Sequence, residues 1–286
     1  MKKTNSNKKD TIVILGAGQM GKAVAEALNP NKTKLLGFGD NDSKKWNKII
    51  KPVDKSIGLK PDIIIISVLD DERANQLEEQ AYECGFNGEI VNLKAVYGMF
   101  DIRSKTIKSI ANRINEKKIP GEIAELGVYK GDITWQLNYL FPKRSLHLFD
   151  TFEGFDERDI YKEKENLYSE AKKGDFRDTS VSDVMERVMY PQNVVVKKGF
   201  FPDTADWHWE TNYAFVSIDT DLYAPTLAGI EYFYPKLSEG GVIIMHDYNS
   251  LQFRGVKKAV DEYEKRCGLL KIIPVGDLHG SCVILK

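Results

Sequence analysis

The sequence is organised around one stretch, Tyr213-Ala214-Phe215-Val216-Ser217-Ile218-Asp219-Thr220-Asp221-Leu222-Tyr223, in which an apolar run ends in two carboxylates. A second run of the same kind follows it, Val242-Ile243-Ile244-Met245-His246-Asp247, and ends in His-Asp. Continuous apolar runs of this length are typical of parallel strands that are covered on both faces. The two runs therefore predict an α/β fold built on a parallel sheet.

Four polar side chains stand at the ends of these two strands: Asp219, Asp221, His246 and Asp247. In open α/β sheets the ligand lies beyond the carboxyl ends of the strands, so neighbouring strands would bring the four together. Three carboxylates and an imidazole suit a divalent metal ion, an acid/base site, or both. The alternative is that the Asp residues only cap the helices that follow. Four such residues at two strand ends favour a site.

Length indicates two domains, with one large domain as the alternative, and composition indicates a soluble protein. The chain has 286 residues, 42% of them hydrophobic, and a formal net charge of −1. This balance offers no strong field for nucleic acid or an anionic membrane, and no apolar run approaches membrane-spanning length. Cys84, Cys267 and Cys282 lack CxxC spacing, which favours a reducing compartment and argues against a zinc site. Residues 1–10 have no apolar signal region, so we expect a disordered tail and a cytoplasmic protein.

Residues 11–100 are predicted to form a small Rossmann-like domain of the nucleotide-binding type. The strand Thr11–Leu15 runs into the glycine turn Gly16-Ala17-Gly18-Gln19-Met20-Gly21, and a helical pattern follows. In this context the glycines let the backbone approach a pyrophosphate at the helix N-terminus. Asp40 ends the next strand, where an acid can bond the ribose of an adenine dinucleotide. Gly16, Gly18, Gly21 and Asp40 are therefore candidates for binding a nucleotide.

The alternative for this domain is that its glycines only permit close packing of helix on sheet. Residues 11–100 contain no Tyr-x-x-x-Lys pair after these strands, so this domain carries no signature of hydride transfer. The domain resembles the small Rossmann-like domains that precede some sugar-modifying enzymes, a generic likeness that names no ligand.

The domain boundary is predicted near residue 100, where Val96-Tyr97-Gly98-Met99-Phe100 breaks the pattern. Residues 101–118 then show the apolar spacing of an amphipathic helix, which ends at Pro120-Gly121. We expect this helix to pack against the second domain; the alternative is that its apolar face joins two subunits of a homo-oligomer.

The second domain, residues 101–286, opens with an ExGxxxG pattern made by Glu125, Gly127 and Gly131. A strand runs into Gly127 and a helix begins after Gly131. This turn is looser than GxGxxG and suits the amino-acid portion of S-adenosylmethionine (SAM), which has no pyrophosphate. Asp150 ends the next strand, where it can accept hydrogen bonds from ribose hydroxyls. We therefore expect these four residues to bind SAM.

The rest of this domain predicts a lid and a characteristic sheet. Residues 151–178 are polar, charged and aromatic and fit no strand. A loop of this length is usually a lid or binding loop, so we expect it to cover the acceptor substrate; a plain surface insertion is the alternative. Leu270–Val275 and Ser281–Leu285 are predicted to close the chain as an antiparallel pair. The strand count and this terminal hairpin describe a class I SAM-methyltransferase sheet.

Residues 119–250 resemble the macrocin O-methyltransferase (TylF/MycF-like) family, which methylates sugar hydroxyls; the likeness does not reach residues 1–100. The matching segments occur in order: Pro120-Gly121-Glu122-Ile123-Ala124-Glu125-Leu126-Gly127-Val128-Tyr129-Lys130-Gly131, Asp150-Thr151-Phe152-Glu153-Gly154, Lys198-Gly199-Phe200-Phe201-Pro202-Asp203-Thr204, Asp219-Thr220-Asp221-Leu222-Tyr223 and Tyr234-Pro235-Lys236-Leu237-Ser238-Glu239-Gly240-Gly241.

The resemblance implies a cofactor, a metal ion and a base. SAM would lie near Phe152, and a divalent metal, usually Mg²⁺, would be held by Asp219, His246 and Asp247. The family's proposed general base matches Asp221. Its antibiotic-sugar members carry Asp-Asp where this chain has His246-Asp247. Imidazole is a softer ligand than carboxylate, so Mn²⁺ is an alternative to Mg²⁺, or His246 serves as a base.

The predicted function is a metal-dependent O-methyltransferase that acts on a hydroxyl of a small-molecule or carrier-linked sugar. A sugar amine or a carboxylate is an alternative acceptor, and an amine would need no metal. Two other function classes stay open. One is an oxidoreductase or epimerase that binds NAD(P) or a nucleotide sugar at Gly16–Gly21; the other is a non-catalytic scaffold whose first domain binds a nucleotide.

Overall fold

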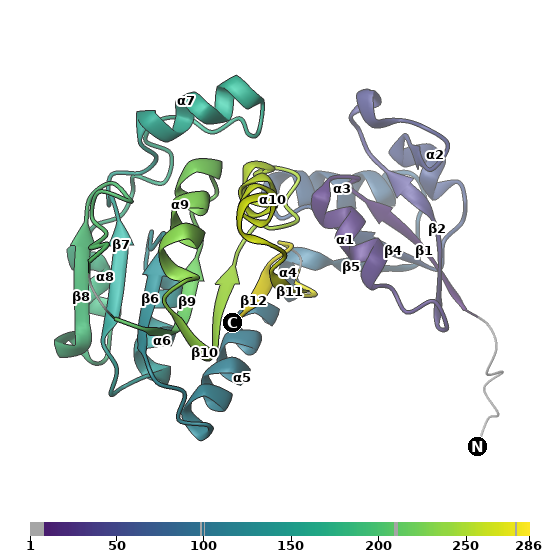
Figure 1. Ribbon diagram of the computed structural model, residues 1–286. Helices are drawn as coiled ribbons and strands as arrows, with labels where there is room; N and C mark the ends of the chain where they lie inside the picture. Colours follow the sequence, from purple (N-terminus) through teal and green to yellow (C-terminus); the bar gives the residue numbers. More distant parts are fainter. Residues whose placement is uncertain (1–8, 98, 100, 209–210, 278) are drawn as a thin grey trace, which may run out of the picture. The chain divides into compact units, whose positions relative to one another are not determined.

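The chain divides into two compact units, Met1–Asp101 and Ile102–Lys286. A computed structural model (Figure 1) describes residues 9–97, 99, 101–208, 211–277 and 279–286. Most of the predicted tail, residues 1–8, lies outside the described residues, as do Gly98 and Phe100 of the predicted joint. The two units are described separately below.

Among the described residues of the first unit, five parallel strands form one sheet in the order β3-β2-β1-β4-β5. The strands are β1 (Asp10–Leu15), β2 (Thr33–Gly39), β3 (Ile50–Lys51), β4 (Ile63–Ile66) and β5 (Glu89–Asn92). The helices are α1 (Gln19–Ala27), η1 (Ser43–Lys45), α2 (Val53–Ile57), α3 (Asp71–Glu83) and α4 (Leu93–Tyr97). Strand β1 begins at Asp10, inside the predicted tail, and β3, α2 and α4 were not predicted.

Apolar residues of β1 and β4 lie in the core of this unit. Val13, Leu15, Ile64 and Ile66 lie on one face of β1 and β4 and pack against apolar residues of α2 and α3. Strand β4 is shorter than the predicted run from Pro61 to Val68 because only Ile63–Ile66 pairs with β1 and β5.

The described residues of the second unit contain a seven-stranded sheet in the order β11-β12-β10-β9-β6-β7-β8. Its strands are β6 (Glu122–Leu126), β7 (Leu146–Asp150), β8 (Val194–Lys198), β9 (Tyr213–Ile218), β10 (Leu237–Met245), β11 (Lys271–Pro274) and β12 (Cys282–Leu285). β12 runs antiparallel to both β10 and β11. The predicted sheet with a terminal antiparallel hairpin is therefore confirmed.

Helices cover both faces of this sheet (Figure 1). On one face α5 (Ile102–Glu116), α6 (Asp132–Leu140) and α8 (Val181–Arg187) share a core with Ile123, Phe215 and Ile244. On the other face α9 (Tyr223–Phe233) and α10 (Gly255–Cys267) share a core with Leu126, Ile218 and further sheet residues. The apolar face of α5 therefore packs within the second unit, as predicted; a homo-oligomer stays a prediction.

Two expectations for this unit were wrong. The helix predicted from Pro225 to Leu237 ends at Phe233, and β10 already begins at Leu237. The segment 151–178 is not a plain loop, because it contains α7 (Glu157–Asn166). Apolar periodicity missed this helix since two of its three buried residues are acids, Asp159 and Glu163. Across the described residues, each helix is too short or too polar to cross a membrane.

Candidate functional site

A cavity of about 400 Å³ lies at the carboxyl ends of β6, β7, β9 and β10 in the second unit. Parallel strands bring the residues that follow them to one edge of the sheet, which is where open α/β sheets bind ligands. The cavity is lined by most of the side chains that the sequence singled out in this unit, namely Glu125, Gly127, Asp150, Asp219, Asp221, His246 and Asp247.

The turn after β6 can only be made by glycine. Gly127 has φ +85°, and a Cβ atom there would lie 2.0 Å from the carbonyl oxygen of Asp219. The backbone N–H of Asp219 in turn donates to the carbonyl oxygen of Leu126 (2.8 Å). Gly131, with φ +77°, is the N-cap of α6 and leaves space for Val184. The predicted turn is thus held directly against the end of β9.

Asp150 at the end of β7 fixes the same turn. Its Oδ2 accepts hydrogen bonds from the backbone N–H groups of Val128 (2.6 Å) and Tyr129 (3.0 Å). Its Oδ1 accepts one from the backbone N–H of Phe152 (2.6 Å). A carboxylate has about four acceptor positions, so a ribose hydroxyl would share oxygens that already hold the backbone. The ribose role of Asp150 stays a prediction.

The backbone of Phe152 contacts Asp150, but its side chain does not reach the cavity. Its side chain is buried in the core beneath α5, α6 and α8, and among the described residues it is absent from the cavity wall. The neighbouring aromatic residues Phe155, Phe176 and Tyr129 line the cavity instead. Their ring centroids are 5.2 Å apart in each successive pair.

Glu125 is a buried carboxyl group at the base of the cavity. It is only 2% exposed, and its Oε2 accepts a hydrogen bond from the Thr134 hydroxyl (2.6 Å). Burial raises the pKa of Glu125 to about 8, although the Thr134 hydrogen bond opposes the shift. Glu125 therefore carries a proton at neutral pH in the ligand-free protein.

Asp219, Asp221, His246 and Asp247 form one cluster, as predicted. Each offers a donor atom, and these atoms all lie within 4.8 Å of one another. His246 Nδ1 is 3.0 Å from Asp219 Oδ1 and 2.7 Å from Asp247 Oδ2. Three carboxylates and one imidazole are a donor set that a divalent cation accepts, so the residues present fit the predicted metal.

Unusual backbone conformations aim two of these side chains. Asp221 has φ +59° and Asp247 has φ +55°, in the left-handed region that Asp tolerates better than most residues. Such conformations cost free energy and persist where the surrounding structure fixes them. At both strand ends the chain thus turns sharply enough to bring a carboxylate back over the sheet edge.

Sequence reasoning missed two cationic or titratable neighbours of this cluster. Arg103, in the first turn of α5, places Nη1 2.7 Å from Asp219 Oδ2. His279, between β11 and β12, has its ring centroid 5.1 Å from that of His246. Neither could be found by spacing, because each reaches the site from an element distant in sequence and carries no motif.

Charge interactions shift the titration of the whole cluster. Burial alone would raise the pKa of Asp219, but the positive charges of His246 and Arg103 hold it well below its usual range. Burial, together with the negative charges of Asp219 and Asp247, raises the pKa of Asp221 well above its usual range. Burial would lower the pKa of His246, but the Asp219 carboxylate raises it to about 10.

The segment 151–178 contributes to the cavity wall through α7. Asp156 and Asp159 line the cavity. Glu163 is completely buried; its Oε1 accepts from the backbone N–H of Tyr223 (2.7 Å) and its Oε2 from the Ser169 hydroxyl (2.6 Å). These bonds tie α7 to the turn that carries Asp221.

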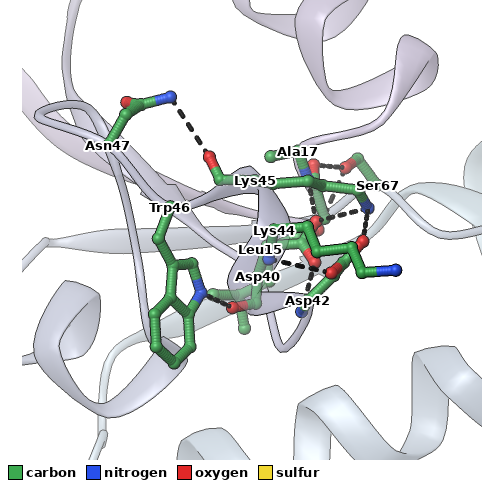
Figure 2. Close-up of polar contacts among 10 residues, drawn as sticks. Leu15, Ala17, Asp40, Asp42, Lys44, Lys45, Trp46, Asn47 and Ser67 are labelled. Carbon is green, nitrogen blue, oxygen red and sulfur yellow. Dashed lines mark hydrogen bonds and ion pairs between the residues drawn. The ribbon is translucent and has the colours of Figure 1, made fainter.

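In the first unit, Asp40 supports the glycine turn (Figure 2). Its Oδ2 accepts from the backbone N–H of Ala17 (2.8 Å) and from Lys45 Nζ (3.1 Å), and its Oδ1 accepts from the backbone N–H of Asp42 (2.9 Å). Burial raises the pKa of Asp40, but the hydrogen bonds from Ala17 and Asp42 outweigh it and lower the pKa overall. The Asp40 carboxylate therefore already accepts a hydrogen bond from the backbone of the glycine turn.

The three glycines of this turn differ in what they permit. Gly16 has φ +98°, and a Cβ on Gly21 would lie 2.0 Å from the carbonyl oxygen of Gly16. Gly21 therefore allows helix α1 to pack closely on its own turn, as the packing alternative requires. Gly18 faces open space, with no atom within 4 Å of a Cβ placed there. Nucleotide binding by this unit stays a prediction.

Comparison with known proteins agrees with the second unit's architecture. The model of the family "Macrocin-O-methyltransferase (TylF)" matches residues 64–285, so the family match begins within the first unit and not at residue 119 as the motifs indicated. Among solved structures, the O-methyltransferase NovP is similar with a TM-score of 0.53 and 20% identity, over 65% of this chain and 79% of that one. The calicheamicin methyltransferase CalS11 is similar with a TM-score of 0.51 and 18% identity, over 76% and 86%. These two likenesses concern the fold.

Curated relatives match over part of their length. The chain is 25% identical over 186 residues to the 8-demethyl-8-(2,3-dimethoxy-alpha-L-rhamnosyl)-tetracenomycin-C 4'-O-methyltransferase of Streptomyces olivaceus, which is 59% of this chain and 66% of the relative. It is 27% identical over 175 residues to the mycinamicin III 3''-O-methyltransferase of Micromonospora griseorubida, 57% of this chain and 67% of the relative. The match thus spans about two thirds of these relatives. Since the family model covers most of the sequence, the chain belongs to the macrocin-O-methyltransferase (TylF) family.

Proposed function

We propose that the protein transfers the methyl group of SAM to a hydroxyl group of a sugar or a sugar-containing metabolite. The observation that carries this proposal is the meeting of the glycine turn at Gly127 and the cluster of Asp219, Asp221, His246 and Asp247 at one cavity. Membership of the family supports it, and so do the relatives' names, one of which is an O-methyltransferase of a rhamnosyl compound.

The donor would lie across the carboxyl ends of β6 and β7. Glu125, Gly127, Gly131 and Asp150 are the residues proposed to hold it. The close fit of Gly127 against Asp219 supports this place, because the turn packs on the end of β9 and still lines the cavity. Tyr129 adds an aromatic wall.

The reaction needs a proton acceptor beside the sugar hydroxyl. The S–CH₃ bond breaks as the O–CH₃ bond forms, the hydroxyl proton passes to a base, and S-adenosylhomocysteine leaves. We assign the base to Asp221, since a carboxylate of raised pKa accepts a proton more readily, and such a base contributes on the order of 10²- to 10⁴-fold. His246 is less suited to that role because its Nδ1 already lies between two carboxylates.

Asp219, His246 and Asp247 are proposed to hold a divalent cation. When bound, such an ion supplies positive charge that favours the ionised carboxylates and lowers the pKa of a coordinated hydroxyl. Asp159, Phe155 and Phe176 of segment 151–178 also line the cavity, and we propose that they contact the acceptor.

The test separates binding from turnover. Calorimetry should show S-adenosylhomocysteine binding to the wild-type protein and to Asp221→Asn alike. Methyl transfer to a panel of free and nucleotide-linked sugars, measured with labelled SAM, should fall at least about 100-fold in Asp221→Asn. Asp183→Asn, an exposed change in the same unit, is the control. Unchanged turnover in Asp221→Asn would remove Asp221 as the base, and absence of S-adenosylhomocysteine binding would overturn the proposed function.

The rival functions of the first unit have a simple test. Calorimetry with NAD and with UDP-glucose would detect the predicted nucleotide site near Gly16, Gly18 and Asp40. A change in nicotinamide absorbance on addition of a sugar nucleotide would favour the oxidoreductase alternative.

A further inference from the structure

Arg103 contacts the cluster at Asp219, one of the three residues proposed to hold a metal ion. Its guanidinium Nη1 lies 2.7 Å from Asp219 Oδ2, and the two side chains are 20% and 23% exposed. The contact links the first turn of α5 to the carboxyl end of β9. Both side chains are partly buried, and charges interact more strongly there than at an open surface.

Both carboxylate oxygens of Asp219 are already engaged. Oδ2 accepts from Arg103, and Oδ1 lies 3.0 Å from His246 Nδ1. An ion coordinated by Asp219 must use one of these oxygens, so an existing contact has to lengthen or be shared. It would also place two positive charges beside a guanidinium that stays protonated at any relevant pH.

We propose that Arg103 and a divalent cation compete for Asp219, so that Arg103 sets the metal affinity of the site and holds the carboxylate in place while no ion is bound. This inference rests on the proposed metal-assisted methyl transfer and deepens it. Arg103 is thus a positioning residue that acts through Asp219. The simpler alternative is that Arg103 only anchors α5 to the sheet edge. That alternative predicts no gain in metal affinity when the guanidinium is removed.

The experiment is calorimetry of Mn²⁺ binding to the full chain. Arg103→Met keeps most of the aliphatic stem and removes the charge. We expect its Kd for Mn²⁺ to fall by about tenfold or more relative to wild type, because a positive charge next to the ion is lost. Arg103→Lys keeps the charge in a shorter side chain without the bidentate fork and should give an intermediate Kd. Arg113→Met removes the same charge from an exposed position of the same helix and should leave the Kd unchanged.

Each outcome decides the proposal. Tighter Mn²⁺ binding by Arg103→Met but not by Arg113→Met supports competition. Equal or weaker binding by a folded Arg103→Met overturns it and favours the tether. If Arg103→Met does not fold, the Kd values of Arg103→Lys and Arg103→Gln for Mn²⁺ are compared with that of wild type instead. Absence of Mn²⁺ binding to every variant overturns the proposal, while S-adenosylhomocysteine binding and methyl transfer on the same samples show whether the proposed function survives.

Discussion

Replacing Glu125 by Gln should make the protein increasingly more stable than wild type as the pH rises from 5 to 8. Glu125 is 2% exposed, and among the described residues its side chain accepts a hydrogen bond from the Thr134 hydroxyl (2.6 Å). Burial raises its pKa from 4.5 to about 8. Gln has nearly the same shape as a protonated Glu, so it reproduces the neutral form without the capacity to ionise.

The sign and size follow from proton linkage. The unfolded chain releases the Glu125 proton near pH 4.5, whereas the folded protein keeps it until about pH 8. Stability from this group is therefore fully present below the unfolded pKa and is lost as pH rises through the folded pKa. The loss amounts to about 1.4 kcal/mol per pH unit, or roughly 4 kcal/mol between pH 5 and pH 8.

The assay is urea unfolding of wild type, Glu125→Gln and the exposed control Glu116→Gln at several pH values from 5 to 8. The difference in unfolding free energy between Glu125→Gln and wild type should grow in favour of the variant as pH rises. Other titrating groups cancel in this difference. A difference that does not change with pH, or that matches the one for Glu116→Gln, would refute the assignment of a buried, protonated Glu125.

Two further changes test the framework of the site. Gly127→Ala places a Cβ 2.0 Å from the Asp219 carbonyl oxygen, so it should lower the free energy of unfolding by more than about 3 kcal/mol and abolish S-adenosylhomocysteine binding in calorimetry. The control is Gly276→Ala, whose Cβ meets no atom within 4 Å. Full binding by Gly127→Ala would contradict the proposed role of the turn. Glu163→Ala removes the acceptor of the Tyr223 N–H and Ser169 hydroxyl and should cost about 2–4 kcal/mol, with faster amide exchange at Tyr223. The exposed change Glu165→Ala should do neither, and equal exchange in both variants would argue against α7 being held this way.

Strands β9 and β10 and the polar cluster that follows them could be predicted from the sequence, because they depend on apolar runs and on the parallel arrangement of the strands. Continuous apolar runs marked β9 and β10, and the acids and imidazole directly after them had to meet once the strands became neighbours. The glycine turn at Gly127 was predictable for the same reason, since its residues are consecutive. In these cases residues that are consecutive in the sequence, or that directly follow neighbouring strands, are also neighbours in the structure.

The rest depended on tertiary contacts that leave no local trace. Helix α7 was missed because Asp159 and Glu163 occupy its buried face, where a periodicity rule expects apolar side chains. Arg103 is 116 residues from Asp219 and belongs to a helix whose other Lys and Arg residues face solvent. Asp150 and Asp40 were placed correctly at strand ends, yet each is engaged in holding its own glycine turn.

The same contact that explains Gly127 also explains how donor and acceptor would be aligned. The turn that is proposed to hold SAM touches the backbone of Asp219, and the Asp219 N–H is bonded to Leu126 at the end of β6. The donor turn after β6 and Asp219 after β9 therefore follow adjacent strands, and His246 and Asp247 follow β10, the next strand along. Sites built on rigid elements hold reacting groups more closely than sites on loops, and alignment of this kind supplies much of the rate of a displacement between two bound molecules. Glu163 ties segment 151–178 to the start of α9, and covering the acceptor is the role that we propose for this segment.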